Sequence, residues 1–194
     1  MREHADNAIR QPSAIRRWLS IALLLVGFWL ALGLLGRQLL TDSGFGIWTG
    51  AWTENTSQWI ADPYTFSHVL HGIFFYWLLL SVRRRLTVWP RFMIANVMEA
   101  AWEIIENTPM VIDRYRAATA SLDYYGDSIL NSTFDLFAAM LGFWLAWKYD
   151  WKWVLLFVVA IELVLAYFVR DNLTLNVLML FYPLDSIKEW QMST

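Results

Sequence analysis

The chain has 194 residues, of which 58% are hydrophobic and 17% aromatic, while only 16% are charged. A soluble domain usually has about a quarter of its residues charged, so this composition excludes an ordinary soluble protein and indicates an integral membrane protein. The net charge of -2 excludes the basic surface by which proteins hold nucleic acid. The absence of cysteine excludes disulfides and thiolate chemistry.

Apolar runs along the chain predict an all-α, polytopic membrane helical bundle with five spans. A bilayer span needs about 20 apolar residues. The predicted spans cover residues 18–40, 64–82, 90–105, 127–147 and 153–168. The apolar segment 173–184 is shorter than a normal span, so we expect it to be re-entrant, interfacial or a sixth span. Residues 1–17 are predicted to form a cytoplasmic basic tail, and residues 18–194 a single transmembrane helical domain.

Basic residues orient this bundle. Arg83, Arg84 and Arg85 form the strongest basic cluster of the chain, so the positive-inside rule makes their loop cytoplasmic. Two predicted spans precede this loop, so we expect the N-terminus to be cytoplasmic as well. The first apolar run is too long for the hydrophobic region of a signal peptide, and no small-residue cleavage site follows it. We therefore expect it to remain as a span.

Polar residues near the predicted outer ends of three spans share single helix faces. The second span has a pair of histidines, the third has carboxylates at i, i+4 and i+7, and the fourth has polar residues at i, i+4 and i+8. In chain order these residues are His68, His71, Glu99, Glu103, Glu106, Asp127, Asn131 and Asp135. At 1.5 Å per residue they lie within roughly 12 Å of the outer surface. Because a carboxylate inside a span is costly and marks function by default, the pattern predicts an outward-facing polar cavity.

The residue types in this cavity are those of a carboxylate–histidine metal site. Imidazole together with carboxylate oxygen suits Zn²⁺, Mn²⁺ or Fe²⁺, and helical bundles build such sites from Glu and His on facing helices. The predicted ligands are His68, His71, Glu103 and Asp127. A bound metal would lower the pKa of water toward 7 and generate a hydroxide nucleophile.

Further residues complete the predicted site. Glu99 and Asp135 are predicted as catalytic carboxylates behind the ligands, and Glu106, which is nearest the opening, as the general base. Arginine holds anionic groups through two hydrogen bonds. The predicted substrate-binding residues are Arg114, Arg116 and Asn131.

The same residues also have plainer structural explanations. Two histidines on one helix are more often hydrogen-bonded packing residues than metal ligands, and Asp127 is most simply the N-cap of the fourth span. Asp135 and Glu99 lie inside spans, where no such role is open to them. Glu162, in the fifth span, is expected to pair with a neighbouring helix or to face a partner protein.

Several motifs resemble a known family. They include Ser67-His68-Val69-Leu70-His71-Gly72, Ala101-Trp102-Glu103-Ile104-Ile105-Glu106-Asn107-Thr108-Pro109 and Leu122-Asp123-Tyr124-Tyr125-Gly126-Asp127-Ser128. Over about residues 40–190 the chain resembles bacterial inner-membrane proteins of uncharacterised protein family 0314, also catalogued as domain of unknown function 2585. This resemblance implies a bacterial plasma-membrane location and supplies no activity. The order of a histidine span, a glutamate span and a Gly-Asp motif is also similar to VanZ-like membrane proteins, which favours chemistry on envelope lipids or glycans.

Three functions follow as hypotheses. The first is a metal-dependent hydrolase or transferase that works in the lipid bilayer on an envelope lipid or an anionic headgroup, without nucleic acid and with no protein partner specified. The second is a small ion-coupled transporter, although the cytoplasmic halves of the spans are expected to lack matching polar groups. The third is a structural or assembly subunit whose polar stripes satisfy one another.

Overall fold

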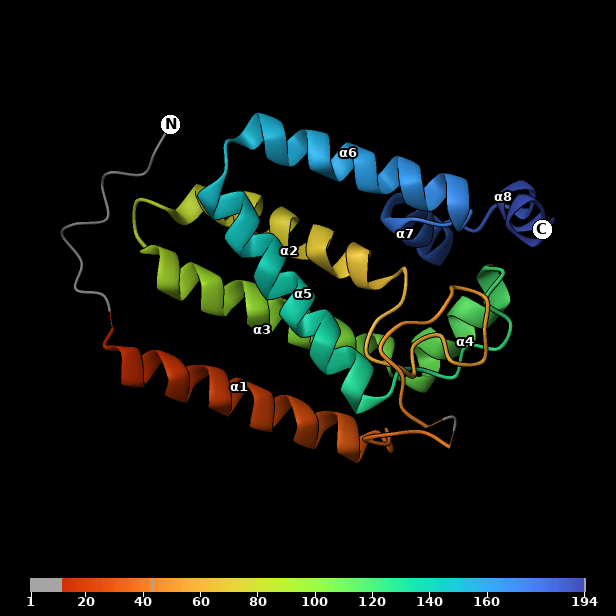
Figure 1. Cartoon of the computed structure of the whole chain (residues 1–194), viewed down its shortest axis with the longest axis horizontal. Coiled ribbons are helices and arrows are strands. Elements are labelled where there is room, and N and C mark those ends of the chain that lie inside the picture. Colours follow the sequence, from red (N-terminus) through yellow and green to blue (C-terminus); the bar gives the residue numbers. More distant parts are fainter. Residues whose placement is uncertain (1–11, 43, 194) are drawn as a thin grey trace.

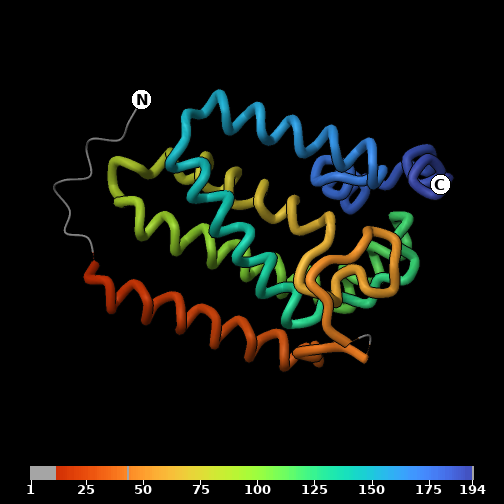
Figure 2. Tube along the Cα trace, in the orientation of Figure 1, coloured from red at the N-terminus to blue at the C-terminus, as the bar shows by residue number. Residues whose placement is uncertain are grey.

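The computed structural model describes residues 12–42 and 44–193, and it confirms the all-α fold class. Five long helices run back and forth between the two ends of the bundle (Figure 1). They are α1 (Ala14–Leu34), α2 (Thr65–Leu79, extended by the 3-10 turn η1, Leu80–Val82), α3 (Val88–Glu106), α5 (Ile129–Lys148) and α6 (Trp151–Phe168). Three short helices gather with the 35–64 loop at one end, which we call the loop end (Figure 2). These short helices are α4 (Pro109–Ala118), α7 (Leu173–Phe181) and α8 (Asp185–Met192).

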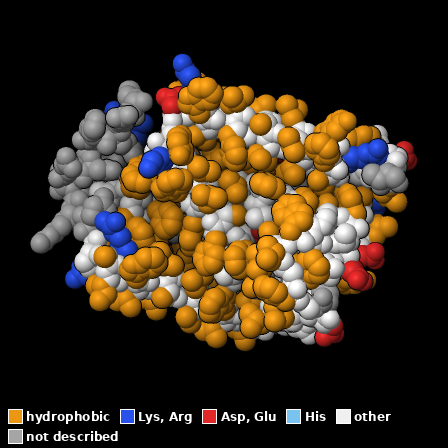
Figure 3. Space-filling model, viewed as in Figure 1, with side chains coloured by type: hydrophobic (Ala, Val, Ile, Leu, Met, Phe, Trp, Pro, Cys, Tyr) orange, Lys and Arg blue, Asp and Glu red, His pale blue; other side chains and the backbone are white. Residues whose placement is uncertain are grey.

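The surface agrees with a membrane protein. Within the described residues, α1, α2 with η1, α5 and α6 are long and apolar enough to cross a membrane. Hydrophobic side chains cover the middle of the molecule, while most charged side chains in view lie toward its two ends (Figure 3). Helix α3 has 19 residues, or about 28 Å, a similar length. It falls outside this apolar group because of its polar residues, several of which are buried.

Some boundaries differ from those predicted. Helix α1 begins four residues before the predicted start and ends at Leu34 rather than residue 40. Gly36, at φ +78°, turns the chain there, and the Arg37 N–H donates to the Leu32 carbonyl at 3.0 Å. Residues 1–11 of the predicted basic tail lie outside the described residues.

The outer segments are more helical than predicted. The predicted loop 107–126 contains α4, which begins at Pro109, a residue suited to a first helical turn. In the 173–184 segment, α7 has only nine residues, or about 14 Å, so the sixth-span alternative is not formed. Glu162 faces α7 and accepts hydrogen bonds from the Leu173 and Thr174 N–H groups at 3.0 and 3.1 Å. Glu162 therefore accepts from backbone N–H groups at the start of α7. This is the pairing with a neighbouring helix, one of the two roles predicted for it.

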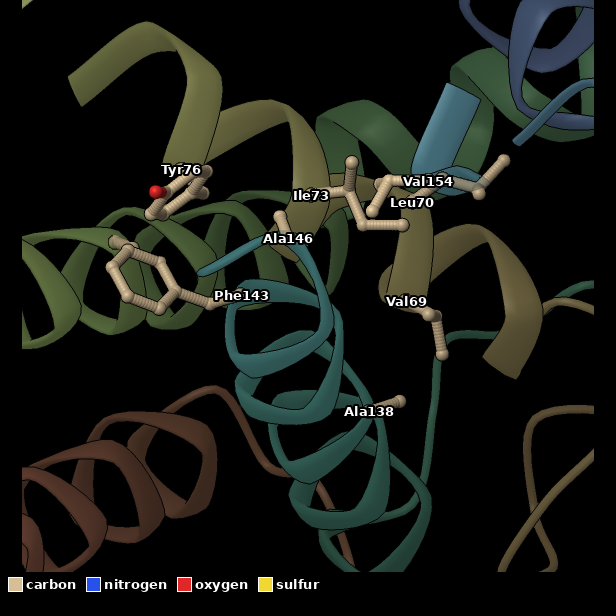
Figure 4. Packing of buried hydrophobic residues seen from close by; sticks show 9 residues of the cluster. Val69, Leu70, Ile73, Tyr76, Ala138, Phe143, Ala146 and Val154 are labelled. Atoms are coloured by element: carbon tan, nitrogen blue, oxygen red, sulfur yellow. The ribbon is translucent and has the colours of Figure 1, made fainter. Parts of the chain in front are cut away.

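Helices α2 and α5 form the closest pair in the bundle. A Cβ atom at Gly72 would overlap the Ala139 carbonyl oxygen, and one at Gly142 would overlap the Val69 carbonyl oxygen. Small residues let helix backbones approach in this way. Toward the other end of the crossing, Tyr76 packs edge-to-face on Phe143 with ring centroids 5.2 Å apart (Figure 4). The crossing places His68 of α2 beside Asp135 of α5, with His68 Nε2 3.9 Å from Asp135 Oδ2.

The start of α5 is held by the preceding loop. Ser128, rather than Asp127, is the N-cap, and its Oγ accepts from the Asn131 N–H at 3.0 Å. The prediction that Asp127 caps this helix is therefore wrong. Ser128 Oγ also donates to the Gln58 carbonyl at 2.9 Å, so the loop before α2 packs onto the bundle here.

Candidate metal centre

A cavity of about 590 Å³ lies at the loop end. Its wall combines α2 and α5 with the last turn of α3, the loop residues 51–57, the segment 120–125 and part of α7. The sequence-predicted residues that line it are His68, His71, Glu106, Asp127, Asn131 and Asp135. Glu99 and Glu103 are 0% and 1% exposed, so they lie behind this wall.

Glu99 joins the two histidines. His68 Nδ1 lies 2.6 Å from Glu99 Oε1, and His71 Nδ1 lies 3.1 Å from Glu99 Oε2. An ionised carboxylate can only accept hydrogen bonds, so both imidazoles then donate from Nδ1. The lone pair of each Nε2 is left for another partner, as in metal sites where a carboxylate orients a histidine ligand.

Glu103 has no comparable partner. Its Oε1 lies 3.1 Å from His68 Nδ1, but the geometry is not that of a hydrogen bond. Among the described residues, neither oxygen of Glu103 has a hydrogen-bond partner, although both are buried. Burying a charged group without a partner is costly, so this carboxyl group requires a proton or a cation.

His68 belongs to two groups with metal-ligand geometry. Within each group, one ligand atom per residue lies within 4.8 Å of the others. The two groups are His68, His71 and Glu99, and His68, Glu103 and Glu106. On the opposite side of the same imidazole, His68 Nε2 lies 3.9 Å from Asp135 Oδ2 on α5. Asp135 Oδ1 is buried and has no hydrogen-bond partner among the described residues.

Asp127 belongs to neither group. Its Oδ2 accepts from Asn107 Nδ2 at 2.8 Å and from the Tyr124 hydroxyl at 3.1 Å. Its backbone N–H donates to Asn107 Oδ1 at 2.7 Å. Burial raises the pKa of Asp127 above its usual value, against the lowering effect of these hydrogen bonds. Its role as a metal ligand stays a prediction.

The three predicted substrate-binding residues lie apart from one another. Arg114 Nε donates to the Leu180 carbonyl at 2.9 Å, and Arg116 Nη2 donates to Asp113 at 2.5 Å. Neither arginine lines the cavity. Asn131 does line it, and its Nδ2 donates to the Trp59 carbonyl at 2.9 Å.

Sequence reasoning missed Asp62 as part of the cavity and recognised it only as the residue before a helix-starting proline. Asp62 is 1% exposed, and its two oxygens accept from the Ser57 and Tyr64 N–H groups at 2.8 and 2.7 Å. Burial raises its pKa despite these hydrogen bonds. The sequence signal that could have identified Asp62 is the position of an acidic residue directly before a predicted span.

Sequence reasoning also misjudged the other half of α3. Arg91 and Asn96 are 0% and 1% exposed, so polar residues continue inside the bundle away from the cavity. The guanidinium of Arg91 lies 5.8 Å from the centre of the Tyr76 ring. The expectation that the cytoplasmic halves of the spans lack polar groups is therefore wrong. Arg91 opens the predicted span and had been counted with the basic loop.

Comparison with known proteins gives a family without a known activity. A family model described as a protein of unknown function, DUF2585, matches residues 32–193. A UPF0314 protein of Rhizobium meliloti is 49% identical over 160 residues, which is 81% of each chain. A UPF0314 protein of Paracoccus denitrificans is 44% identical over 174 residues, covering 88% of this chain and 89% of the relative. No solved structure matches the chain significantly. The resemblance to VanZ-like proteins stays a prediction.

Proposed function

The chain belongs to the DUF2585 family, whose UPF0314 members have no assigned activity, and we propose that it is a divalent-metal-dependent enzyme of the bacterial membrane. The observation that carries this proposal is the arrangement around His68. That histidine lines the cavity and is oriented by Glu99. It lies 3.1 Å from Glu103, whose buried oxygens have no hydrogen-bond partner among the described residues. A divalent cation would supply the positive charge that the buried Glu103 carboxylate requires next to it.

The ligands we assign are His68, Glu103 and Glu106, whose ligand atoms lie within 4.8 Å of one another. Zn²⁺, Mn²⁺ and Fe²⁺ suit this mixture of imidazole and carboxylate. Three protein ligands are typical of a catalytic metal site, which keeps a further position for water or substrate. Glu106 and His68 line the cavity, so that position is reachable from it.

The remaining residues act around this centre. Glu99 keeps His68 and His71 in the Nδ1–H tautomer and fixes both rings. Such a metal would lower the pKa of a bound water toward 7. Asp135 would accept the proton of such a water, because its Oδ2 lies 3.9 Å from His68 Nε2 and its Oδ1 has no hydrogen-bond partner within the described part of the chain.

The substrate we propose is an envelope lipid whose phosphate or other anionic group binds the metal and is hydrolysed or transferred. Support comes from the position of the cavity at one end of a bundle of apolar helices, where a lipid headgroup lies. The opposite end of the bundle carries Arg83, Arg84 and Arg85 in a loop, Lys148 at the end of α5 and Lys152 at the start of α6. By the positive-inside rule that end is cytoplasmic, so the cavity opens on the outer side of the inner membrane.

Lipid turnover tests this proposal. Purified protein, loaded with Zn²⁺ or Mn²⁺, is mixed with vesicles made from a bacterial lipid extract, and lipid products are followed by mass spectrometry. We expect products with metal, none with chelator, and none from the Asp135→Asn variant. The matched control is Asp113→Asn, which changes an exposed acid of the loop end outside the cavity. Turnover that is unaffected by both chelator and Asp135→Asn would overturn the proposal.

A second candidate function, an ion-coupled carrier, is favoured by one specific observation. Buried polar residues extend along α3 from Glu103 through Glu99 and Asn96 to Arg91, over 12 residue steps or about 18 Å. A row of this length crosses much of the hydrocarbon core. Proton or cation flux into proteoliposomes, lost in Asn96→Leu and in Glu99→Gln, would support a carrier. Flux equal to that of protein-free vesicles would count against it.

A further inference from the structure

The described cavity wall is acidic and aromatic, without a basic side chain other than histidine. Its acidic residues come from the loops, from α3 and from α5, and they are Glu54, Asp62, Glu106, Asp123, Asp127 and Asp135. Neither lysine nor arginine is among the described lining residues. A substrate that carried only negative charge would meet attraction from the metal and repulsion from every other ionised group of this wall.

Basic side chains are present nearby, but none of those that the structure describes lines the cavity. Several donate to backbone carbonyl groups, and one pairs with an aspartate. These basic residues are Arg37, Arg114, Arg116, Arg170 and Lys188. The loop end therefore contains cations without directing any of them into the cavity.

Seven of the residues that line the cavity are exposed, and we call four of them, Trp52, Glu54, Asp123 and Tyr125, the rim. The other three are Thr53, Leu122 and Val177. The Trp52 indole is held in position because its Nε1 donates to the Val169 carbonyl at 3.1 Å. The Tyr125 ring already has a cation against it, since the Arg116 guanidinium lies 5.0 Å from its centre. Aromatic faces next to carboxylates are the surroundings that proteins use for ammonium groups.

The interior of the cavity gives an independent sign of a missing ligand. Asp135 is only 4% exposed and lines the cavity, yet its Oδ1 has no hydrogen-bond partner in the described part of the chain. A buried carboxylate oxygen without a partner is costly unless a ligand supplies one. The interior thus has a buried carboxylate oxygen that a ligand's hydrogen-bond donor would satisfy.

We propose that the cavity binds a headgroup with an ammonium group, which lies between the rim carboxylates and the rim aromatic rings. The assignment to a lipid rests on the proposed function, in which the anionic part of the same headgroup reaches the metal. The substrate class is then a zwitterionic phospholipid of the ethanolamine or choline type. The attraction to the ammonium group itself does not depend on the metal.

Binding of short-chain lipids to the chelator-treated protein tests this inference separately from the metal. The probes are dihexanoylphosphatidylcholine, dihexanoylphosphatidylglycerol and choline chloride, measured by calorimetry in detergent. We expect the choline lipid to bind about tenfold more tightly than the glycerol lipid. In the double variant Glu54→Gln, Asp123→Asn this preference should disappear. Both substituted residues are exposed, which limits the effect on folding. Glu189→Gln, which changes an exposed acid of α8 outside the cavity wall, is the control with unchanged preference.

The outcomes separate the two proposals. Equal affinity for the two lipids, or a preference that survives the double variant, would overturn the ammonium site. If choline binds as tightly as the choline lipid, the ammonium site is supported and its natural ligand is a free ammonium compound. If choline binds much more weakly, the ammonium site is supported with the lipid as its ligand. Ammonium-selective binding by a protein that shows no metal-dependent turnover would leave this inference standing while the proposed enzyme fails. Metal-dependent turnover without a preference between the two headgroups would support the proposed enzyme and overturn the ammonium site.

Discussion

At the scale of single residues, the centre of the site is one carboxylate shared by two imidazoles. Glu99 accepts from Nδ1 of His68 and of His71, and it is completely buried. The spacing of polar residues along the chain predicted that these groups meet at one depth. The spacing could not predict which carboxylate oxygen accepts from which imidazole nitrogen, because that depends on how α2 and α3 are rotated toward each other.

Glu99→Gln tests the orienting role. A glutamine amide offers one acceptor oxygen instead of two, so it cannot hold both rings as the carboxylate does. Loss of such an orienting partner typically weakens metal binding by about 10–100-fold. We expect a decrease of this size in Zn²⁺ affinity, measured by competition with a chromophoric chelator. An unchanged affinity would show that Glu99 is only a packing group.

Asp171 gives a pH dependence that is independent of the metal. It lies after α6 and is 2% exposed, and burial raises its pKa to about 6. An unfolded aspartate titrates near about 3.9. The native state therefore holds its proton more tightly, and the contribution of Asp171 to stability is lost as the pH rises from about 4 to about 6.

Asp171→Asn should remove this slope. The amide oxygen can still accept from the Asn172 N–H, a bond of 3.0 Å in the native protein. We expect the variant to gain thermal stability relative to the native chain between pH 4.5 and pH 7, followed by tryptophan fluorescence in detergent. A difference between the two proteins that is the same at both pH values would contradict the assignment.

At the scale of elements, the site depends on the crossing of α2 and α5. Gly72 and Gly142 sit where each backbone touches the other helix. The apolar runs predicted both helices, with starts within two residues of the observed ones. The closeness of their contact was not predicted, because glycines in a span indicate close packing without naming the partner helix.

Gly142→Ala tests this crossing. Its Cβ would overlap the Val69 carbonyl oxygen, which cannot move away without shifting the helix. Overpacking of this kind costs about 1–3 kcal/mol, so we expect a lower unfolding temperature and weaker metal binding. The matched control is Gly27→Ala in α1, where a Cβ meets no atom within 4 Å. That variant should be as stable as the native chain or slightly more stable. Equal effects of the two substitutions would contradict the crossing argument.

The short elements were the least predictable. Helix α4 and the folded loop before α2 lie outside the apolar pattern, so hydropathy carries no signal for them. Their positions depend on single hydrogen bonds, such as the one from Ser128 Oγ to the Gln58 carbonyl. These segments supply Asp62, Trp52 and Tyr115 to the cavity wall. Sequence reasoning therefore found the residues that face one another from the spans and missed those that the loops bring over them.

At the scale of the whole molecule, the account requires that the loop end and the basic end lie on opposite sides of the membrane. The chain contains no cysteine, so single cysteine substitutions can be labelled without a background. Glu54→Cys lies at the rim and Arg84→Cys in the basic loop. We expect a membrane-impermeant maleimide to label the first in intact cells and the second only after permeabilisation. Labelling of Arg84→Cys in intact cells would reverse the orientation.

The central claim, that the His68 centre binds a divalent metal, is tested most directly by calorimetric titration of the chelator-treated protein with Zn²⁺. The native chain should bind one ion, and Glu103→Gln should lose most of this affinity because it removes a ligand whose oxygens have no hydrogen-bond partner among the described residues. Glu162→Gln, which changes a half-buried carboxylate of α6 that contacts α7 instead, should bind as the native chain does. Equal binding by the native chain and Glu103→Gln, or no binding by either, would contradict the account.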